Sequence, residues 1–299
     1  MSSYPSRSSG KVAKQSMFNF DGEKDLESIP NKIGHADVSK MQVSSILTKA
    51  SGFMNTYDFT LNPYSGCTFG CVYCYAAAFA RDGEKRTNWG KWVDVKENAL
   101  SLIRKQHGKL KDSIVYMSSV TDPYQPVDRV TKITRELIKE LFEQKAKVVI
   151  QTRSPLVKRD ADILAKFKNR VQVNMTVTTD SEKVRKQFEP TCSSNEARLG
   201  AIKKIADEGI PSCITMTPLL PVEDPLAFAD KLLSTGVQRF IIQPFHEEKG
   251  RFIAGTREGA MSLIKEMEWS KQKYEKTRDI LRTRLPQLGE GKEGFAPPM

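Results

Sequence analysis

Apolar and polar residues follow two alternating rhythms along most of the chain. The segment from Tyr57 to Pro63 alternates roughly with a period of two, which indicates a strand. Short apolar runs then recur, and most are followed by a segment with apolar residues at helical spacing. The further strands expected from this pattern are residues 114–117, 148–150, 171–178, 210–217 and 237–243. Six strands that alternate with helices predict an α/β fold with a parallel sheet.

Capping signals mark where several helices begin. Asp94 with Glu97 three residues later has the spacing of a capping box and predicts a helix from this point. Ser193 and Glu196 predict the start of another helix, and Asp224 precedes a proline at a first helical position. Six βα units are two short of a full (β/α)8 barrel. Periodicity alone therefore leaves two architectures open, a partial barrel and an open, doubly wound sheet.

The two ends of the chain differ from this repeating centre. Residues 1–44 are polar with weak periodicity, and we expect a disordered or extended arm, either a solvated tail or a basic arm that touches a polyanion. Residues 45–255 form the expected core domain. Residues 256–299 are expected to form one long charged helix to about Leu285, packed across the core, and then a Gly/Pro-rich tail.

Composition narrows the class of protein. A chain of 299 residues can bury one large core, and it has no apolar run long enough to predict a membrane span. The formal net charge of +11 favours phosphate-bearing partners such as DNA or RNA, with positive surface expected around 96–111 and 132–147. The N-terminus lacks the apolar core of a secretory signal, although its Ser, Lys and Arg content leaves an organelle-transit reading open. Five cysteines, three of them clustered, suit a reducing compartment, and we expect a cytoplasmic protein.

The three clustered cysteines are the strongest chemical signal. Cys67, Cys71 and Cys74 have the spacing C-x3-C-x2-C directly after the first expected strand. Structural zinc normally takes four protein ligands, and no histidine lies nearby. A [4Fe–4S] cluster held by three thiolates fits better and leaves one iron open for a small molecule. Zinc binding and redox thiols remain the alternatives.

This loop, with the aromatic Tyr73 before its third cysteine, resembles the signature loop of radical S-adenosylmethionine (SAM) enzymes. Other segments are similar to the branch of that family related to spore photoproduct lyase, and the resemblance runs from about Ser45 to about Phe245. These segments are residues 45–49, 62–64, 121–126, 152–154 and 189–190. The resemblance implies a partial (β/α)6 TIM barrel, a [4Fe–4S] cluster, SAM, and an electron donor such as flavodoxin or ferredoxin. It also implies reductive cleavage of SAM to a 5′-deoxyadenosyl radical that abstracts hydrogen from a substrate.

Polar residues gather at the carboxyl ends of the six strands, where ligands bind in parallel α/β folds. The resemblance implies that Tyr73 lies beside the adenine of SAM. It implies that Ser118 and Ser119 meet the amino group, in place of the family's usual Gly-Gly-Glu-like segment. Polar groups of the fourth strand commonly meet the ribose, which makes Asn174 and Thr176 candidates.

Other polar residues at these ends have two interpretations each. Arg198 is either a partner of the SAM carboxylate or a surface charge on a helix. Thr152 and Arg153 are candidates for binding the cofactor or a substrate phosphate. Asp122 either stabilises its proline-rich loop or touches the ligand.

The remaining cysteines decide how far the resemblance extends. Spore photoproduct lyases return a hydrogen atom from a cysteine near the end of the second strand, where this chain has Ser118 and Ser119. Cys192 is the candidate substitute donor, Cys213 is expected to serve packing, and His246 is a weak acid–base candidate. The leading hypothesis is a radical SAM enzyme that acts on a nucleic-acid base or another phosphate-bearing substrate. The alternative is a metal- or cluster-stabilised nucleic-acid-binding protein without turnover.

Overall fold

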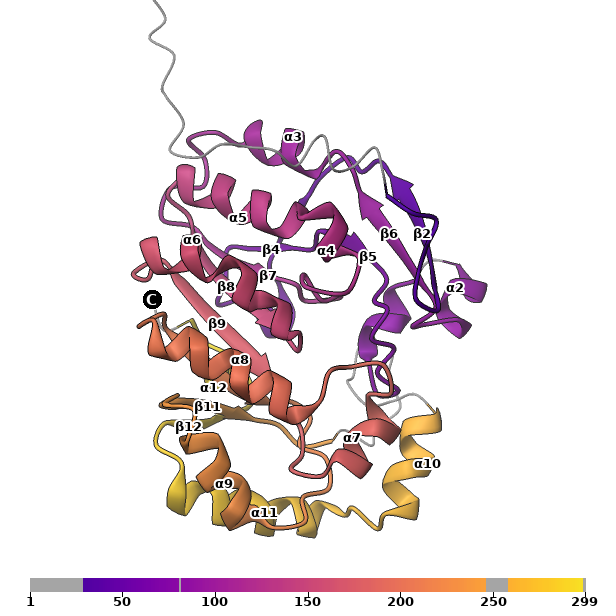
Figure 1. Cartoon of the computed structure of the whole chain (residues 1–299), viewed down its shortest axis with the longest axis vertical. Helices are drawn as coiled ribbons and strands as arrows, with labels where there is room; N and C mark the ends of the chain where they lie inside the picture. The colour runs from indigo at the N-terminus through magenta and orange to yellow at the C-terminus, as the bar shows by residue number, and fades with distance from the viewer. Residues whose placement is uncertain (1–28, 81, 246–257, 298–299) are drawn as a thin grey trace, which may run out of the picture.

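The computed structural model describes residues 29–80, 82–245 and 258–297 (Figure 1). Its centre is an eight-stranded sheet with the order β12-β11-β10-β9-β8-β7-β4-β3. The six central strands are β4 (Phe59–Leu61), β7 (Ile114–Met117), β8 (Lys147–Thr152), β9 (Val171–Thr176), β10 (Ser212–Met216) and β11 (Arg239–Ile242). They are parallel and adjacent in chain order, without the reversal of a doubly wound sheet. The fold is therefore the partial TIM-barrel type, and the six predicted strands are confirmed.

The two edges of this sheet contain strands that the sequence pattern missed. β3 (Leu47–Lys49) pairs antiparallel with β4, and β12 (Leu288–Glu290) pairs parallel with β11. The prediction of a Gly/Pro-rich tail is wrong for β12 and for the short helix α12 (Gly291–Gly294) that follows it. The glycines here serve a close approach, because a Cβ on Gly289 would lie 2.7 Å from the Cα of Gly294.

A second, four-stranded sheet stands beside the barrel with the order β1-β2-β6-β5. Its strands are β1 (Lys32–Ile33), β2 (Ala36–Met41), β6 (Trp92–Lys96) and β5 (Tyr64–Ser65). The arm predicted for residues 1–44 is therefore wrong over β1 and β2, where Ala36 and Val38 are buried and alternate with exposed residues. Residues 1–28 lie outside the described residues.

The predicted capping box at Asp94 is also wrong. Asp94 lies in β6, where its carboxylate accepts a hydrogen bond from Ser39 at 2.6 Å and pairs with Lys85 at 2.6 Å. The helix begins later, as α3 (Ala99–Arg104). Lys96 was expected to add positive surface, but it is half-buried and donates to the carbonyl of Asn62 at 2.8 Å. Burial lowers the pKa of Lys96 to about 8.

Helices cover the outer face of the barrel (Figure 1). They are α4 (Asp128–Thr131), α5 (Ile133–Glu143), η3 (Pro155–Asp160), α6 (Ala161–Lys166), α8 (Asn195–Asp207) and α9 (Pro225–Leu233). The short α7 (Glu182–Phe188) instead lies beside the cysteine loop, where the carbonyl of Phe188 accepts from the backbone of Val72. The N-cap of α8 is Ser194 instead of the predicted Ser193, and the predicted cap of α9 at Asp224 is confirmed. Shorter segments are η1 (Gly52–Met54), η2 (Tyr75–Phe79) and α2 (Gly83–Thr87).

The long C-terminal helix is wrong as predicted. The chain forms two helices there, α10 (Glu258–Glu266) and α11 (Lys271–Arg284). Glu268 adopts a left-handed φ of 50°, and the Ser270 side chain accepts a hydrogen bond from the backbone of Lys273 to cap α11. A non-glycine residue in this conformation interrupts a helix, so the apolar periodicity continues across a break.

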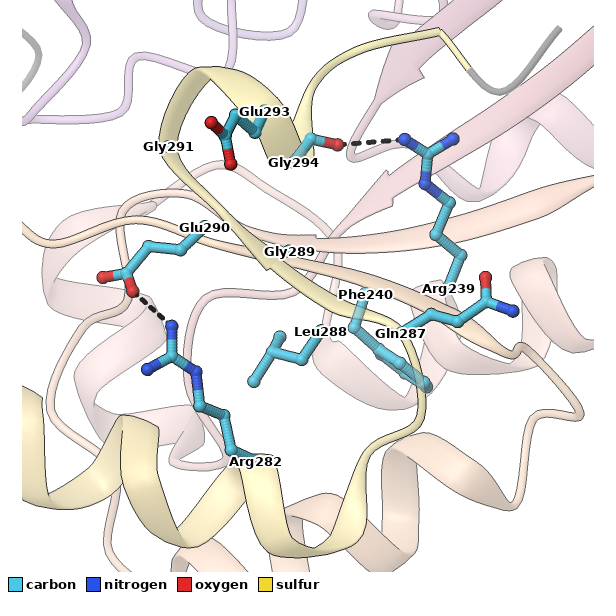
Figure 2. Close-up of a pocket in the computed structure, with 10 residues that line it drawn as sticks. All are labelled: Arg239, Phe240, Arg282, Gln287, Leu288, Gly289, Glu290, Gly291, Glu293 and Gly294. Atoms are coloured by element: carbon cyan, nitrogen blue, oxygen red, sulfur yellow. Dashed lines mark hydrogen bonds and ion pairs between the residues drawn. The ribbon is translucent and has the colours of Figure 1, made fainter.

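The C-terminal segment also ties the two edges of the sheet together. The Tyr57 hydroxyl, just before β4, donates to the carbonyl of Phe295 at 2.6 Å, and the Phe53 and Phe295 rings pack edge to face. Phe295 also packs on the buried Cys213, which confirms the packing role predicted for that thiol. A pocket beside β12 is bordered by the Arg282–Glu290 ion pair at 2.6 Å (Figure 2). None of its lining residues belongs to the site described next.

Among the described residues no helix is both long and apolar enough to cross a membrane.

Candidate cluster and cofactor site

The cysteine loop leaves β5 at the carboxyl end of the first parallel strand and ends at η2. Its path depends on Gly66 and Gly70, which have φ of 79° and 55°. A Cβ on Gly66 would lie 2.6 Å from the Trp92 ring, and one on Gly70 would lie 3.1 Å from the Cα of Gly90. Trp92 belongs to β6, so the second sheet packs directly against the loop. That close approach requires glycine at both positions.

The three cysteines of the loop are largely enclosed by the protein. Cys67 and Cys71 are buried and Cys74 is half-buried. Burial raises the pKa of the Cys67 thiol, and the nearby Asp122, Cys71 and Cys74 raise it further. Within the part of the chain that the structure describes, no three potential ligands converge on one metal ion. A [4Fe–4S] cluster binds each thiolate at a different iron, so its three ligands need not converge on one metal ion.

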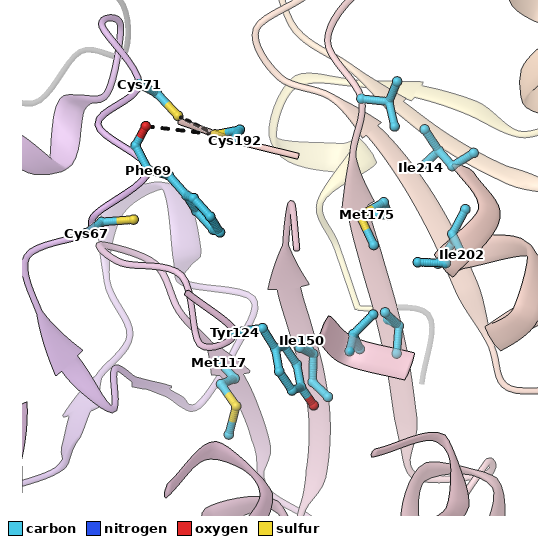
Figure 3. Packing of buried hydrophobic residues seen from close by; sticks show 14 of the residues in the cluster. Cys67, Phe69, Cys71, Met117, Tyr124, Ile150, Met175, Cys192, Ile202 and Ile214 are labelled. Carbon is cyan, nitrogen blue, oxygen red and sulfur yellow. Dashed lines mark hydrogen bonds between the residues drawn. The ribbon is translucent and has the colours of Figure 1, made fainter. Parts of the chain in front are cut away.

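Cys192 contacts this loop from the segment before α8. Its sulfur lies 3.7 Å from the sulfur of Cys71 and 3.9 Å from the carbonyl oxygen of Phe69 (Figure 3). The structure thus brings a fourth cysteine to the three of the signature loop. The hydrogen-donor role of Cys192 stays a prediction, and its observed neighbour is a cysteine of the loop.

Glu189 is the centre of the polar groups behind the loop. It is fully buried and accepts hydrogen bonds from the Tyr73 hydroxyl, from Thr178 at 3.1 Å and from Arg153 at 3.1 Å. Its second oxygen pairs with Arg198 at 2.5 Å. Burial raises the pKa of Glu189, but the positive charges of Arg198 and Arg153 outweigh it and lower this pKa to about 2. The carboxylate is therefore held in its charged form.

Arg153 connects Glu189 to the cysteine loop. One guanidinium nitrogen lies 2.9 Å from the sulfur of Cys71 and 2.7 Å from the hydroxyl of Tyr73. Arg153 is also placed by its backbone, since its amide donates to Asp122 at 2.8 Å. A cation at this distance from a sulfur favours its thiolate form, the form that binds iron.

Asp122 joins the loop after β7 to the end of β8. It is buried and accepts from the Thr152 hydroxyl at 2.7 Å and from the backbone of Tyr124 at 2.9 Å. The loop-stabilising interpretation of Asp122 is therefore confirmed. The hydroxyl of Thr152 is already used in this bond, and its role in binding a cofactor stays a prediction.

The two serines at the end of β7 have different surroundings. Ser118 has a left-handed φ of 75°, and its buried hydroxyl has no hydrogen-bond partner among the described residues. The hydroxyl of Ser119 accepts from Asn62 at 3.3 Å, and its carbonyl accepts from the hydroxyl of Tyr75. An unpaired buried hydroxyl at the carboxyl end of a barrel strand suits a bound ligand, and it makes Ser118 the better candidate of the two.

Asn174 and Thr176 lie on one face of β9, as predicted, and both are buried. The hydroxyl of Thr176 accepts from Gln151 at 2.7 Å and lies 3.1 Å from that of Thr215. The amide oxygen of Asn174 accepts from Gln172 at 2.6 Å. These bonds form a polar layer inside the barrel, and ribose binding by either residue stays a prediction.

The surface interpretation of Arg198 is wrong. Arg198 is fully buried and, besides Glu189, its guanidinium donates to the carbonyls of Ser193 at 3.0 Å and Thr176 at 3.2 Å. Carboxylate binding to SAM stays a prediction, although these protein partners already occupy the guanidinium. His246 lies outside the described residues.

Sequence reasoning missed the groups that join these loops. Gln125 bonds the cysteine loop, Glu189 is the charged centre, and Gln151 bridges β8 to β9 and β10. Gln125 and Glu189 belong to segments that show the family resemblance, but the sequence pattern does not indicate a role for either side chain. Only the fold shows which atoms they meet.

Comparison with known proteins identifies the class. The sequence profile of the Radical SAM superfamily matches residues 61–231, and the chain belongs to this superfamily. Members use a [4Fe–4S] cluster and SAM, so these are its cofactors. The assignment of Cys67, Cys71 and Cys74 as the cluster ligands stays a prediction.

Particular relatives and structures extend the comparison. MJ0683 of Methanocaldococcus jannaschii, an uncharacterized protein, is 37% identical over 54% of this chain and 61% of its own length. ORF301 of Acidianus two-tailed virus is 28% identical over 73% of this chain and 74% of its own. The match thus spans less than two thirds of the M. jannaschii protein.

Among solved structures, the fold is similar to that of spore photoproduct lyase. The lyase complexed with dinucleoside spore photoproduct has a TM-score of 0.61 and 13% identity, over 90% of this chain and 87% of that one. A cysteine-to-serine mutant of the lyase has a TM-score of 0.60 and 14% identity, over 85% of this chain and 81% of that one. At this identity the likeness establishes the fold alone.

Proposed function

We propose that this radical SAM enzyme cleaves SAM reductively and uses the resulting 5′-deoxyadenosyl radical to abstract hydrogen from a nucleic-acid base or another phosphate-bearing substrate. The observation that supports it best is the cysteine loop at the carboxyl end of the first barrel strand. The unpaired hydroxyl of Ser118 lies at the end of the next strand, and the guanidinium of Arg153, at the end of the strand after that, contacts Cys71 of this loop. When bound, the cluster supplies the electron that splits the sulfonium.

The chain's own residues prepare this site. Glu189 and Arg153 hold the Tyr73 ring beside the loop, where the family resemblance expects the adenine. Ser118 offers a hydroxyl to the amino group of SAM, because a hydroxyl oxygen accepts from an ammonium. The second sheet packs against the loop at Gly66 through Trp92.

A substrate with phosphate or bases is supported by two observations. The formal charge of +11 attracts polyanions, and a structurally similar protein is described as complexed with a dinucleoside. We further propose that the electron comes from a cytoplasmic flavodoxin or ferredoxin. Lyase activity on spore photoproduct itself is not part of the proposal, because two serines stand where those lyases have a cysteine.

One experiment tests the proposal. Anaerobic protein with a reconstituted cluster is incubated with SAM and dithionite, and 5′-deoxyadenosine is measured, first alone and then with oligonucleotides. We expect 5′-deoxyadenosine from the wild type and none from Cys71→Ala. A wild type that holds a cluster and binds nucleic acid, yet leaves SAM intact, would support the alternative of a cluster-stabilised binding protein.

A further inference from the structure

The side chain of Gln125 bonds both peptide groups that flank Cys67. Gln125 lies in the loop between β7 and α4 and is fully buried. Its amide oxygen accepts from the backbone N–H of Thr68 at 3.0 Å. Its amide nitrogen lies 3.3 Å from the carbonyl oxygen of Gly66. These atoms belong to the two peptide bonds that Cys67 forms with its neighbours, so one side chain fixes the backbone on each side of this cysteine.

Thr121 adds a further hydrogen bond to the same backbone. Its hydroxyl donates to the carbonyl of Gly66 at 2.6 Å and accepts from the amide nitrogen of Gln125 at 3.0 Å. From the other side the hydroxyl of Thr191 lies 2.8 Å from the carbonyl of Thr68. Three side chains, those of Gln125, Thr121 and Thr191, therefore hold the backbone of the cysteine loop on both sides of Cys67.

Only an uncharged amide meets both requirements at position 125. It has to accept from one backbone N–H and donate toward one backbone carbonyl in a buried place. A carboxylate keeps the first bond, loses the second and adds a negative charge near the cysteines. An apolar side chain loses both and leaves two buried backbone groups with weaker pairing, which is unfavourable.

We propose that Gln125 is a positioning residue for Cys67: its amide sets the backbone on both sides of this cysteine so that the thiolate meets the cluster without rearrangement of the loop. The inference rests on the proposed role of Cys67 as a cluster ligand. It assigns a role to the glutamine of the segment Thr121–Pro126, whose aspartate serves the neighbouring strand.

Iron release from the reconstituted protein tests this role. Gln125→Leu, Gln125→Glu and wild type are loaded anaerobically, and the rate of iron transfer to a chelator is followed. Loss of an outer partner of a metal ligand typically costs about 10- to 100-fold in affinity, so we expect release from Gln125→Leu to be faster by about this factor. Gln125→Glu keeps one of the two bonds but adds a buried negative charge near the cysteines, so we expect its iron release also to be faster than that of wild type.

Gln144→Leu is the matched control. Gln144 is a buried glutamine whose amide donates to the carbonyl of Ile103 at 2.8 Å between α5 and α3, away from the cysteine loop. We expect it to lower the melting temperature without changing iron release. The electron paramagnetic resonance spectrum of the reduced cluster adds a second measurement, which should change in the Gln125 variants alone.

The outcomes separate this inference from the proposed function. A wild type that takes up no iron would remove the proposed function itself. A wild type that loads normally, with Gln125 variants that release iron at the wild-type rate and give the same spectrum, would overturn the inference alone. If Gln125→Leu does not fold, the nearly isosteric Gln125→Glu decides by the same criterion.

Discussion

Arg198 and Glu189 form an ion pair at 2.5 Å in which both side chains are 0% exposed. Removing one partner from such a pair leaves an uncompensated buried charge and typically costs about 3–5 kcal/mol. Because Arg153 still pairs with Glu189 in Arg198→Met, we expect this variant to lower the free energy of unfolding by the lower end of this range, about 3 kcal/mol, in urea denaturation of the cluster-free protein. The exposed pair Arg284–Asp230, at 2.9 Å, is the control, and Arg284→Met should cost less than about 1 kcal/mol. Equal losses of unfolding free energy in the two variants would contradict the larger contribution that we expect from the buried ion pair.

Asp128 predicts a pH dependence of stability. It is fully buried, where it accepts from the hydroxyl of Tyr64 at 2.5 Å and pairs with Arg159 at 2.8 Å. Burial raises the pKa of Asp128 to about 6, although the positive charge of Arg159 lowers it. Between the unfolded pKa of about 4 and this value the folded state binds an extra proton, so stability is present at low pH and falls as pH rises.

We expect this group to remove roughly 2–3 kcal/mol of unfolding free energy between pH 4 and pH 7. Urea denaturation across this range should show a steeper fall for wild type than for Asp128→Asn, which cannot titrate. Glu189 has a lowered pKa of about 2, so its contribution is lost as pH falls from its unfolded pKa of about 4.3 toward this value, mostly below the window of Asp128. Parallel pH profiles for wild type and Asp128→Asn would show that Asp128 titrates as an ordinary carboxylate.

The three cysteines of the loop are expected to be individually necessary. Three thiolates leave no redundancy, so Cys67→Ala, Cys71→Ala and Cys74→Ala should each abolish cluster assembly and 5′-deoxyadenosine formation. Cys213→Ala, which removes the buried thiol of β10, is the control. This variant should retain both cluster assembly and 5′-deoxyadenosine formation. In the wild type, SAM should alter the electron paramagnetic resonance spectrum of the reduced cluster. A full-strength cluster in any one of the three loop variants would refute the assignment.

Cys71 and Cys192 should form a disulfide when the cluster is absent. Their sulfurs are 3.7 Å apart, and a disulfide needs about 2.05 Å, which a small side-chain movement provides. Diamide would take two electrons and two protons from the two thiols and become the hydrazine. Peptide mass spectrometry should then find the Cys71–Cys192 link, and the linked protein should not accept a cluster until it is reduced. Cys192→Ala should stay competent after the same treatment, and Cys213 should remain a free thiol.

The parts of the fold that the sequence predicted depend on local signals. The cysteine spacing and the apolar strands are patterns of contiguous residues. The strands are confirmed, and the [4Fe–4S] cluster and SAM that the spacing indicates are the cofactors of the superfamily. The local capping pattern at Asp94 predicts a helix, whereas the strand that forms there depends on pairing with Ser39 in β2. β12 was missed for a related reason, since its partner is β11 and its own residues are rich in glycine. Distant pairing overrides local propensity in both places.

For the site too, the sequence marks local segments but does not show the contacts between them. The resemblance marked the segments that contain Asn62, Asp122, Arg153 and Glu189, but their partners lie on other loops. Arg198 shows the limit, because helical spacing cannot tell a surface arginine from one that reaches a buried carboxylate. The hydrogen bonds that Glu189 accepts from Arg153 and Thr178 form only when the ends of β8 and β9 meet the cysteine loop in three dimensions.

The last prediction concerns the substrate. We expect the full chain to bind a DNA or RNA 20-mer weakly, because its formal charge is +11. Neutralising a handful of phosphates should cost roughly 100- to 1000-fold in affinity over a fourfold rise in salt, measured by fluorescence anisotropy. Part of the basic surface expected from the sequence is already paired, since Lys139 binds Glu136 at 2.7 Å and Lys96 is half-buried. Binding that is absent or independent of salt would remove the nucleic-acid half of the proposal.

The same protein should not turn over a spore-photoproduct dinucleotide efficiently. The end of β7 presents Ser118 and Ser119, and a hydroxyl is a much poorer hydrogen-atom donor than a thiol. Cys192 is the remaining buried thiol near the loop, but its sulfur faces Cys71. Repeated turnover that Cys192→Ala blocks, with its cluster still loaded, would refute this prediction and establish Cys192 as the donor. Turnover that Cys192→Ala leaves unchanged would also refute it and would point to a donor other than these thiols.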